Sequence, residues 1–575
     1  MKTLITFKSL WLKSTWFWLV LISLLPLFPL FHEGIPLTHD GRIHIARIAN
    51  FYASLMEGNI IPRWASNLNW GYGSPILEFV YPLSSYVASL FHWMGASLPQ
   101  SVTLVFGFSY IGSILAMYLW VKEQWGEKAG IISAFLYGFA PYRFVDLYVR
   151  GALGEHVAFI FPPLICYFII KLRHVMTKHQ STLNSKAILL PPKEVFIWIL
   201  GLSVSIGGLI LSHNALSLLF IPVMVLYGLW IIFMEKEYRL LYSLYLLLSF
   251  SLGFLLTAFF WLPAIFEAKY TLQDKITAGA ISGNFVPLSW FFYSSWNYGG
   301  GIEFSKTLGV SHWIAIFAFL LSIPKMKKYL RSVALLSLFL FVISLFMMTK
   351  QSNSIWSIVS FLQKFQFPWR FLSLSIFLSS LFGGIAYSVC TYKQYKQHSW
   401  RNIWVGVIVL GIVLSTVGMW KPKAYLTEPE TNYTGIFDGT TDSGELSPVW
   451  SVRFMEYRPK EAIEIISGNA NIVEGIRNTT TREYTVKSDS EVQLVENTLY
   501  YPGWNVLVDN KIVPIEFQSS VHRGLMTFYV SKGIHTVTIL FSDTKVRRMA
   551  NWISALSVIL IVGVGMGGIL WQKRR

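Results

Sequence analysis

The stretch PLTHDGRIHIARI, residues 36–48, gathers ionisable side chains in a chain that is 54% hydrophobic and only 13% charged. Asp40, His44 and Arg47 stand at positions i, i+4 and i+7, which lie on one stripe of an α-helix. On that stripe the carboxylate, beside the imidazole, could take a proton from a hydroxyl group, and the guanidinium could hold a phosphate. The structural alternative is that Asp40 only caps the helix and pairs with His44. We favour the chemical interpretation, because further polar clusters are expected on the same side of a membrane.

The second cluster is PYRFVDLYVRGALGEH, residues 141–156, which holds Asp146, Arg150 and Glu155 between two apolar runs. A cation and two acids within ten residues could bind and activate a polar substrate. Arg150 could instead be an anchor whose charged end reaches water at the membrane surface. Glu155 could simply favour the dipole of the helix that it begins. The sequence leaves both interpretations open for these residues.

Three shorter clusters follow along the chain. LSHNA places His213 and Asn214 in the hairpin between two apolar runs, at the rim of any central cavity, although a histidine there could also be merely solvated. In FPWRF the proline fixes the backbone before Arg370, which suits that arginine to a lipid phosphate; an interfacial anchor is the equal alternative. WLPAIFEAKY carries Glu267, which we interpret as interfacial.

Long apolar runs must position these clusters. Their lengths approach the roughly 20 residues that cross a hydrocarbon core, which predicts an α-helical polytopic membrane protein with juxtamembrane helices. The apolar stretch 76–94 is interpreted as a re-entrant or interfacial helix, because counting it as a span would put Lys-rich loops on both sides. We expect about twelve spans, at 16–31, 102–121, 129–141, 156–171, 195–211, 215–233, 240–262, 309–323, 332–349, 371–391, 402–420 and 549–571.

The basic residues predict the orientation of these spans. Loops on the side of the N-terminus hold 22 Lys and Arg in 73 residues, against 11 in 133 on the other side. This asymmetry predicts a multi-pass plasma-membrane protein with both termini in the cytoplasm and the polar clusters outside. The net charge of +17 therefore reflects topology and does not indicate nucleic-acid binding. The first run has no small-residue cleavage site after it, so we expect an uncleaved anchor.

Three parts of different composition follow from this interpretation: a transmembrane part over residues 1–420, an extracytoplasmic all-β sandwich over 421–548, and a final span with a cytoplasmic tail over 549–575. Alternating strings such as YTVKS and HTVTILF, separated by turn residues, predict the strands. YYPGWNVLVDNKIVPI predicts two strands joined by an Asp-Asn turn. Trp504, Tyr500 or Tyr501 could bind carbohydrate, but packing in the core is the more frequent role.

The quoted clusters also resemble a known family. The run HDGRIHIARIANFYASLMEGNIIPRWASNLNWGYGSPILEFVYPLSSYVASL, with APYRFVDLYVRGALGEHVAFIFPPL, LSHNALSLLFIP and FPWRF, resembles bacterial integral membrane proteins of the "6-pyruvoyl-tetrahydropterin synthase-related" membrane domain family. This resemblance covers roughly residues 30 to 390. The tail YYPGWNVLVDNKIVPI and GLMTFYVSKGIHTVTILF resembles the outer β domain of YfhO-type membrane proteins.

The expected architecture is similar to that of C-type glycosyltransferases, which use a sugar on a polyprenyl phosphate. The resemblance implies that Asp40 is the first-loop acid that acts as base, that Glu155 or Asp146 is a second acid, and that Arg370 holds the phosphate. This chain departs from many members because its first loop has no Asp-Asp or Asp-x-Asp pair. A divalent cation, Mg or Mn, is therefore an open question, and the metal ligands are unknown.

We therefore expect a bacterial enzyme of the cell envelope that moves a sugar from a polyprenyl-phosphate donor to a glycan or other envelope acceptor. Asp40, His44 and Glu155 are the expected catalytic residues. The expected substrate-binding residues are Arg47, Arg63, Asp146, Arg150, His213, Asn214 and Arg370. The alternative class is a non-catalytic transporter or scaffold for lipid-linked glycans or envelope polymer. Transport predicts ionisable residues at mid-depth of several spans, and the sequence has almost none there.

Overall fold

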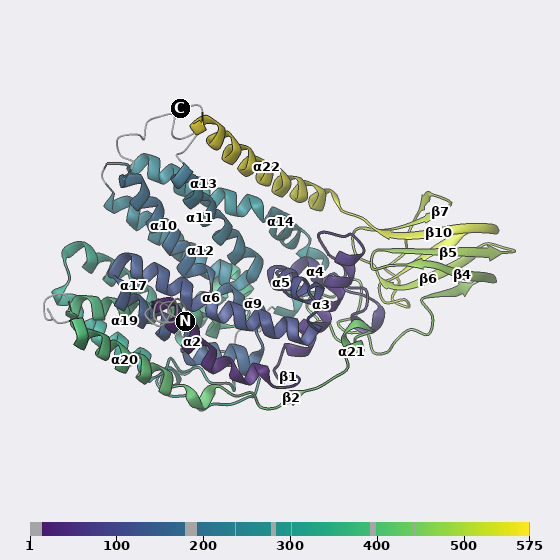
Figure 1. Cartoon of the computed structure of the whole chain (residues 1–575). Coiled ribbons are helices and arrows are strands. Elements are labelled where there is room, and N and C mark those ends of the chain that lie inside the picture. Colours follow the sequence, from purple (N-terminus) through teal and green to yellow (C-terminus); the bar gives the residue numbers. More distant parts are fainter. Residues whose placement is uncertain are drawn as a thin grey trace, which may run out of the picture.

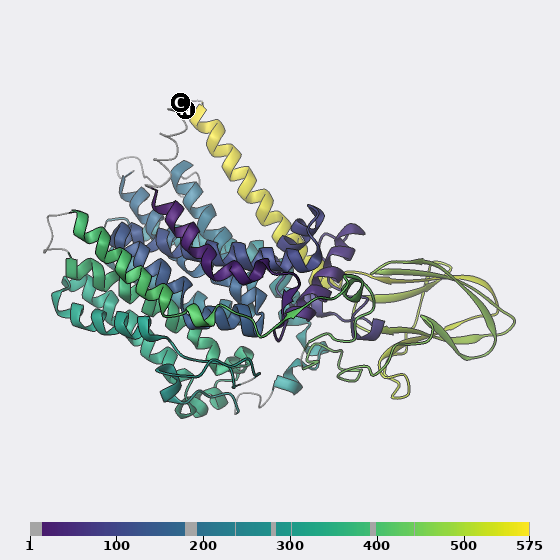
Figure 2. The same ribbon diagram turned by 60° about the horizontal axis from the view of Figure 1, so that its bottom comes forward.

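The computed structural model describes residues 14–178, 193–235, 237–277, 283–300, 302–391, 398–441 and 443–573. A bundle of helices fills one end of the molecule, and a group of β-strands forms the other end (Figures 1 and 2). The C-terminal helix α22 (Lys545–Lys573) runs from the strands along the edge of the bundle, beside α13 (Arg239–Leu256) and α14 (Ala258–Phe266) (Figure 1). The chain is thus a polytopic helical protein with a β domain near its C-terminus.

Nine helices among the described residues are long and apolar enough to cross a membrane. Two shorter apolar segments, Thr15–Phe31 and Val310–Lys325, match the predicted spans at 16–31 and 309–323. The predicted span 129–141 falls on α7 (Glu127–Gly138), which has only 12 residues because Pro141 starts a new helix. The helices that carry the nine candidates are α6 (Leu98–Trp125), α9 (Leu153–Ala158) with α10 (Phe161–Lys178), α11 (Lys193–Ser212), α12 (Asn214–Met234), α13 (Arg239–Leu256), α17 (Lys328–Met347), η10 (Pro368–Phe371) with α19 (Leu372–Thr391), α20 (His398–Leu414) and α22.

The loop before α6 forms the predicted helix and then a short apolar stretch that is interrupted, whereas one helix was expected there. The helix is α3 (Gly41–Met56), whose buried face includes Ile45, Ile48 and Phe51. The stretch 76–94 forms two helices, α4 (Ile76–Phe79) and α5 (Leu83–Trp93), each too short to cross a membrane. Proline 82 lies between them and interrupts the helical hydrogen bonds.

The β domain has two antiparallel sheets. The three-stranded sheet has the order β3 (Ile463–Ser467), β6 (Val492–Leu499), β9 (Leu525–Val530). The five-stranded sheet has the order β4 (Ala470–Arg477), β5 (Thr481–Ser488), β10 (Gly533–Phe541), β7 (Trp504–Val508), β8 (Lys511–Val513). The predicted Asp509-Asn510 turn joins β7 and β8, and both residues have positive φ, as a tight hairpin turn requires.

Two of the three aromatic residues considered for carbohydrate binding lie in the core. Trp504 and Tyr501 are 3% and 0% exposed, and Tyr500 stacks on Phe517 with ring centroids 3.7 Å apart. The core interpretation is therefore confirmed for Trp504 and Tyr501.

Residues 425–434 run along the loop that contains α3. Strand β2 (Tyr425–Leu426) pairs with β1 (Ile35–Pro36), and the short helix α21 (Thr431–Thr434) packs on α3.

Candidate functional site

Arg150 lies at the centre of a buried polar cluster at the end of α8 (Pro141–Val145) and η3 (Asp146–Arg150). Its Nη1 donates to Asp146 Oδ1 at 2.5 Å, to Glu155 Oε2 at 2.6 Å and to Tyr142 Oη at 3.2 Å. The segment η3 is a π-helix, a rare turn that is frequent at functional sites. Both predicted acids of this cluster, Asp146 of η3 and Glu155 of the helix that follows, thus contact the same guanidinium.

Two carboxyl groups and one guanidinium share this buried space, and their environments differ. Burial, followed by the charge of Glu155, raises the pKa of Asp146 well above its usual range. Its Oδ2 atom has no hydrogen-bond partner among the described residues. Glu155 accepts hydrogen bonds from three donors, namely Arg150, Tyr142 and Ser373. Glu155 therefore has more donors than Asp146, while burial favours the neutral form of Asp146.

The backbone of the first loop is tied to this cluster. The backbone N–H of Asp40 donates to the Arg150 carbonyl at 2.9 Å, and that of His39 to the Val149 carbonyl at 3.1 Å. Asp40 occupies the N-cap position of α3, but its side chain makes no capping hydrogen bond within the described loop. The capping role that competed with a chemical one is therefore not the role of this carboxylate.

His44 and Arg47 follow on the same helix, as the spacing predicted. His44 is buried, and burial, together with the charges of Arg47, His213 and Arg150, lowers its pKa to about 3. Its imidazole is therefore neutral at physiological pH. Arg47 donates from Nε and Nη2 to the Thr440 carbonyl, at 3.1 and 2.7 Å, in the segment that precedes the β domain.

His213 and Arg370 approach from the opposite side of the cluster. His213 caps α12, where its Nδ1 accepts from the Leu216 N–H at 3.2 Å, and its ring stacks on Tyr81. Burial raises the pKa of Tyr81 to about 12, and the charges of Arg47, Arg370, Asp40 and Glu155 all act on this phenol in addition. Tyr81 therefore lies among predicted site residues of four separate segments. The first segment contributes Asp40 and Arg47, and the other three contribute Glu155, His213 and Arg370.

Arg370 is buried, with only 9% of its surface exposed, whereas we expected it to face outward. Its Nη1 donates to the Phe365 carbonyl at 2.6 Å and to Gln366 Oε1 at 3.0 Å, which draws the guanidinium back to its own loop. Its Nε has no hydrogen-bond partner among the described residues. This buried N–H donor is thus free to bind an acceptor that enters the site.

Two predicted residues have other contacts. Asn214 donates from Nδ2 to the Phe79 carbonyl at 3.1 Å and links the hairpin to α4. Arg63 lies in a second buried cluster, where its Nη2 donates to Asn551 Oδ1 at 2.9 Å and its Nε lies 3.4 Å from Asp543 Oδ1. The loop after α3 thus carries Arg63, one of the expected substrate-binding residues, to the start of α22 and into a cluster other than that of Arg150.

Lys306 belongs to the site and was not predicted. It is 0% exposed, and its Nζ donates to the carbonyls of Ile302 and Phe304, at 2.7 and 2.8 Å, and lies 3.4 Å from the Phe304 ring centroid. Burial, followed by the charge of Arg150, lowers the pKa of Lys306 to about 6. In the sequence, Lys306 stands out only as a single lysine in a loop rich in aromatic residues.

The chain is similar to known proteins at low sequence identity. No family model matches the chain. The chain is 24% identical, over 325 residues, to an uncharacterised protein of Lactococcus lactis subsp. cremoris. That alignment covers 54% of this chain and 49% of the relative, so this chain spans about half the length of the curated relative.

Three solved structures of glycosyltransferases are similar at a low level. The mycobacterial arabinofuranosyltransferase AftD gives a TM-score of 0.43 at 14% identity, over 72% of this chain and 28% of that chain. ArnT of Cupriavidus metallidurans bound to undecaprenyl phosphate gives 0.40 at 13%, over 71% and 76%. The oligosaccharyltransferase of Archaeoglobus fulgidus tethered with an acceptor peptide gives 0.44 at 16%, over 76% and 57%. Since each TM-score is below 0.5, the case for a function rests on the residues of the site.

The acids of this site do not form a metal centre by themselves. In the described parts of the chain, no group of three or more His, Cys, Asp or Glu side chains is placed to hold a metal ion. Asp146 and Glu155 both pair with Arg150, whose charge offsets part of theirs.

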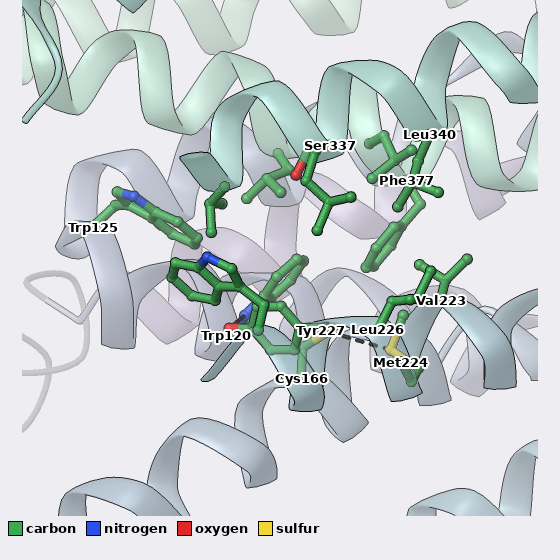
Figure 3. A pocket seen from close by; sticks show the side chains of 15 residues that line it. Trp120, Trp125, Cys166, Val223, Met224, Leu226, Tyr227, Ser337, Leu340 and Phe377 are labelled. Carbon is green, nitrogen blue, oxygen red and sulfur yellow. Dashed lines mark hydrogen bonds between the residues drawn. The ribbon is translucent and has the colours of Figure 1, made fainter. Parts of the chain in front are cut away.

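A narrow apolar cavity of about 40 Å³ lies elsewhere, between α6, α10, α12, α17 and α19 (Figure 3). Figure 3 shows Trp120, Cys166 and Met224 pointing into it. No predicted site residue lines this cavity among the described residues. This apolar cavity is distinct from the polar cluster around Arg150.

Proposed function

We propose that this protein transfers a sugar from a polyprenyl-phosphate donor to an acceptor at the outer face of the plasma membrane. The observation that carries the proposal is the gathering of basic and acidic side chains from distant segments around Arg150, Tyr81 and the start of α3. Such chemistry at the ends of spans suits a substrate with an anionic head group and an apolar tail.

The basic residues would hold the phosphate of the donor. Arg150 and Arg370 are buried guanidinium groups, and Arg370 has a buried Nε without a partner among the described residues. Lys306, whose pKa is lowered to about 6, would gain its proton when an anion binds beside it, because a nearby negative charge favours the charged form. Together these groups would stabilise the negative charge that develops on the departing phosphate.

Asp40 is the proposed base. Asp146 and Glu155 both pair with Arg150. Asp40 is half-buried at the start of α3, and its backbone N–H donates to the Arg150 carbonyl, so this acid lies next to the proposed phosphate-binding arginine. The acceptor O–H would give its proton to Asp40, and the acceptor oxygen would form the new bond to the anomeric carbon. The bond from that carbon to the phosphate oxygen breaks, and polyprenyl phosphate leaves with the electron pair. Neutral His44, one turn further on α3, would orient the carboxylate.

The outer face is proposed from the charge asymmetry of the loops, which places these clusters opposite the Lys-rich side. The family resemblance of the first loop supports the same assignment, since it implies a first-loop acid as base.

The test uses the full chain in nanodiscs with radiolabelled polyprenyl-phosphate sugars, and it follows loss of label from the lipid. We expect turnover by the wild-type protein and a loss of about 10²-fold or more in Asp40→Asn, as is typical when a general base is removed. Glu33→Gln is the matched control, because Glu33 is an exposed acid of the same loop. Parallel reactions with a chelator and with added Mg²⁺ or Mn²⁺ decide whether a cation takes part.

Equal turnover by wild type and Asp40→Asn would remove Asp40 from the chemistry. Absence of turnover with every donor, in protein that still binds the lipid, would favour the transporter or scaffold class instead.

A further inference from the structure

The β domain is open along one side. Strand β3 ends the three-stranded sheet and β4 ends the five-stranded sheet, and only Gly468 and Asn469 separate these two strands in the chain. Both sheet edges therefore lie on the same side of the sandwich. A groove of about 410 Å³ lies between them, lined by residues of β3, β4 and the segment before β3, with Tyr484 of β5 beneath. Figure 1 shows β4 at the margin of the group of strands, away from the bundle.

The two edge strands present apolar side chains to solvent. Val473 and Ile476 of β4 are 58% and 53% exposed, and Ile465 of β3 is 38% exposed. Each strand pairs on one side only among the described strands, β3 with β6 and β4 with β5. An exposed edge strand with apolar residues is a template for a further strand, because its outward N–H and C=O groups can pair with an extended chain.

The charged residues that line the groove are all acidic. Glu461, Glu464 and Glu474 line it, and no Lys or Arg is among its lining residues in the described domain. Glu474 pairs with Arg477 and Glu464 accepts from Asn497, so these carboxylates are held in place at the rim. A second copy of the same edge would bring like charges together, which opposes self-pairing. A partner with basic side chains would be attracted.

We propose that this groove binds an extended polypeptide segment that carries Lys or Arg, added as a strand at the β3–β4 edge. The backbone of the segment would pair with the edge strand. Its apolar side chains would pack on Ile463, Ile472 and Tyr484, and its basic side chains would face the three glutamates. This binding activity is separate from sugar transfer and does not depend on the Arg150 cluster.

The test measures binding of two fluorescent probe peptides to the full chain in nanodiscs. One decapeptide alternates lysine with valine, and the other alternates glutamate with valine. We expect saturable binding of the lysine peptide, weakened by salt, and no binding of the glutamate peptide. Glu461→Lys combined with Glu464→Lys should weaken binding about tenfold or more, since it reverses two charges at the rim. Glu491→Lys, in the exposed turn before β6, is the control for a change of charge outside the groove.

A second variant tests the strand pairing itself. Val473→Pro removes a backbone donor from β4, and it should abolish binding of the lysine peptide while the melting temperature shows that the domain stays folded. Equal binding of both peptides, unchanged binding by the double glutamate variant, or self-association of the chain through this edge would each overturn the proposal. Displacement of the lysine peptide by a neutral oligosaccharide would assign the groove to glycans and overturn it as well.

Discussion

Arg150 is the side chain on which the polar site depends. Its Nη1 atom contacts Asp146, Glu155 and Tyr142, and its guanidinium lies 4.5 Å from the centroid of the Trp369 ring. Glu155 and Asp146 are both 0% exposed, so water does not replace the guanidinium when it is removed. A buried carboxylate that loses its cation keeps the full cost of desolvation.

We therefore expect Arg150→Met to destabilise the protein by about 3–5 kcal/mol, the usual cost of removing one partner of a buried ion pair. Unfolding in mixed micelles measures this change. The double variant Arg150→Met with Glu155→Gln should recover part of the loss, because it also removes the unpaired charge. A single variant as stable as the wild type would show that the guanidinium serves only the substrate and has no structural role.

The sequence predicted which residues would lie close together in much of this cluster, because local spacing carries the signal. Asp40, His44 and Arg47 share a helix stripe, and Asp146, Arg150 and Glu155 lie within ten residues.

Lys306 was missed because no local pattern distinguishes a lysine that a loop buries among aromatic rings. The partners of Arg63 could not be predicted either, because Asp543 and Asn551 are far along the chain.

At the scale of elements, the contact between η3 and the start of α3 depends on one glycine. Gly151 has φ +67°, in the left-handed region, and a Cβ atom there would lie 2.2 Å from Thr38 Oγ1. The residue thus allows the close approach that lets Asp40 and His39 bond to the η3 backbone.

Gly151→Ala should destabilise the protein by about 1–3 kcal/mol and lower donor turnover, because strain and the clash with Thr38 both push α3 away from Arg150. Thermal unfolding and the turnover assay measure the two effects. The matched control is Gly58→Ala, where φ is +91° but nothing lies within 4 Å of the added Cβ, so it tests backbone strain without a clash. If both variants lose the same stability and turnover, the contact with Thr38 does not position α3.

The elements themselves were largely predictable, and the exceptions have physical causes. Apolar length predicts the spans, although α6 starts before the predicted residue 102, at a capping box in which Ser97 and Gln100 bond to each other's backbone. The π-helix η3 was not predictable, because it depends on how buried side chains pack and not on hydrophobic period. The β domain strands begin at Ile463, later than the change of composition at 421, because residues 425–434 run along the first loop.

On the scale of the whole molecule, a second buried cluster joins the β domain end of the chain to the bundle. Arg547 of α22 lies 2.8 Å from Glu78 of α4 and 2.7 Å from Glu267, which follows α14 (Ala258–Phe266). Arg63 lies 4.0 Å from Glu78 and 3.4 Å from Asp543, and Tyr501 donates to the Glu267 carbonyl. Three acids thus face two arginines, so one proton shared among the acids would balance the cluster.

Burial raises the pKa of Glu78 to about 8, from an ordinary value near 4.5, and the nearby charge of Glu267 adds to the rise. A carboxyl group with a raised pKa binds its proton more tightly in the folded protein than in the unfolded chain. Its contribution to the free energy of unfolding is therefore complete below about pH 4.5 and is lost as pH rises toward about 8. Docking of α22 and of the β domain on α4 should weaken over that range.

The melting temperature of the protein in nanodiscs should accordingly fall between pH 6 and pH 8, and Glu78→Gln, which stays neutral at every pH, should flatten this fall. Glu33→Gln, an exposed acid of the same outer loop, should keep the slope of the wild type. Proteolysis in the segment between β10 and α22 gives an independent readout of undocking, because the start of α22 is protected only while Arg547 is buried against Glu78. If the melting temperature of Glu78→Gln falls with pH as steeply as that of the wild type, another group causes the pH dependence. The cluster would then connect the two ends of the molecule in the same way at every pH in this range.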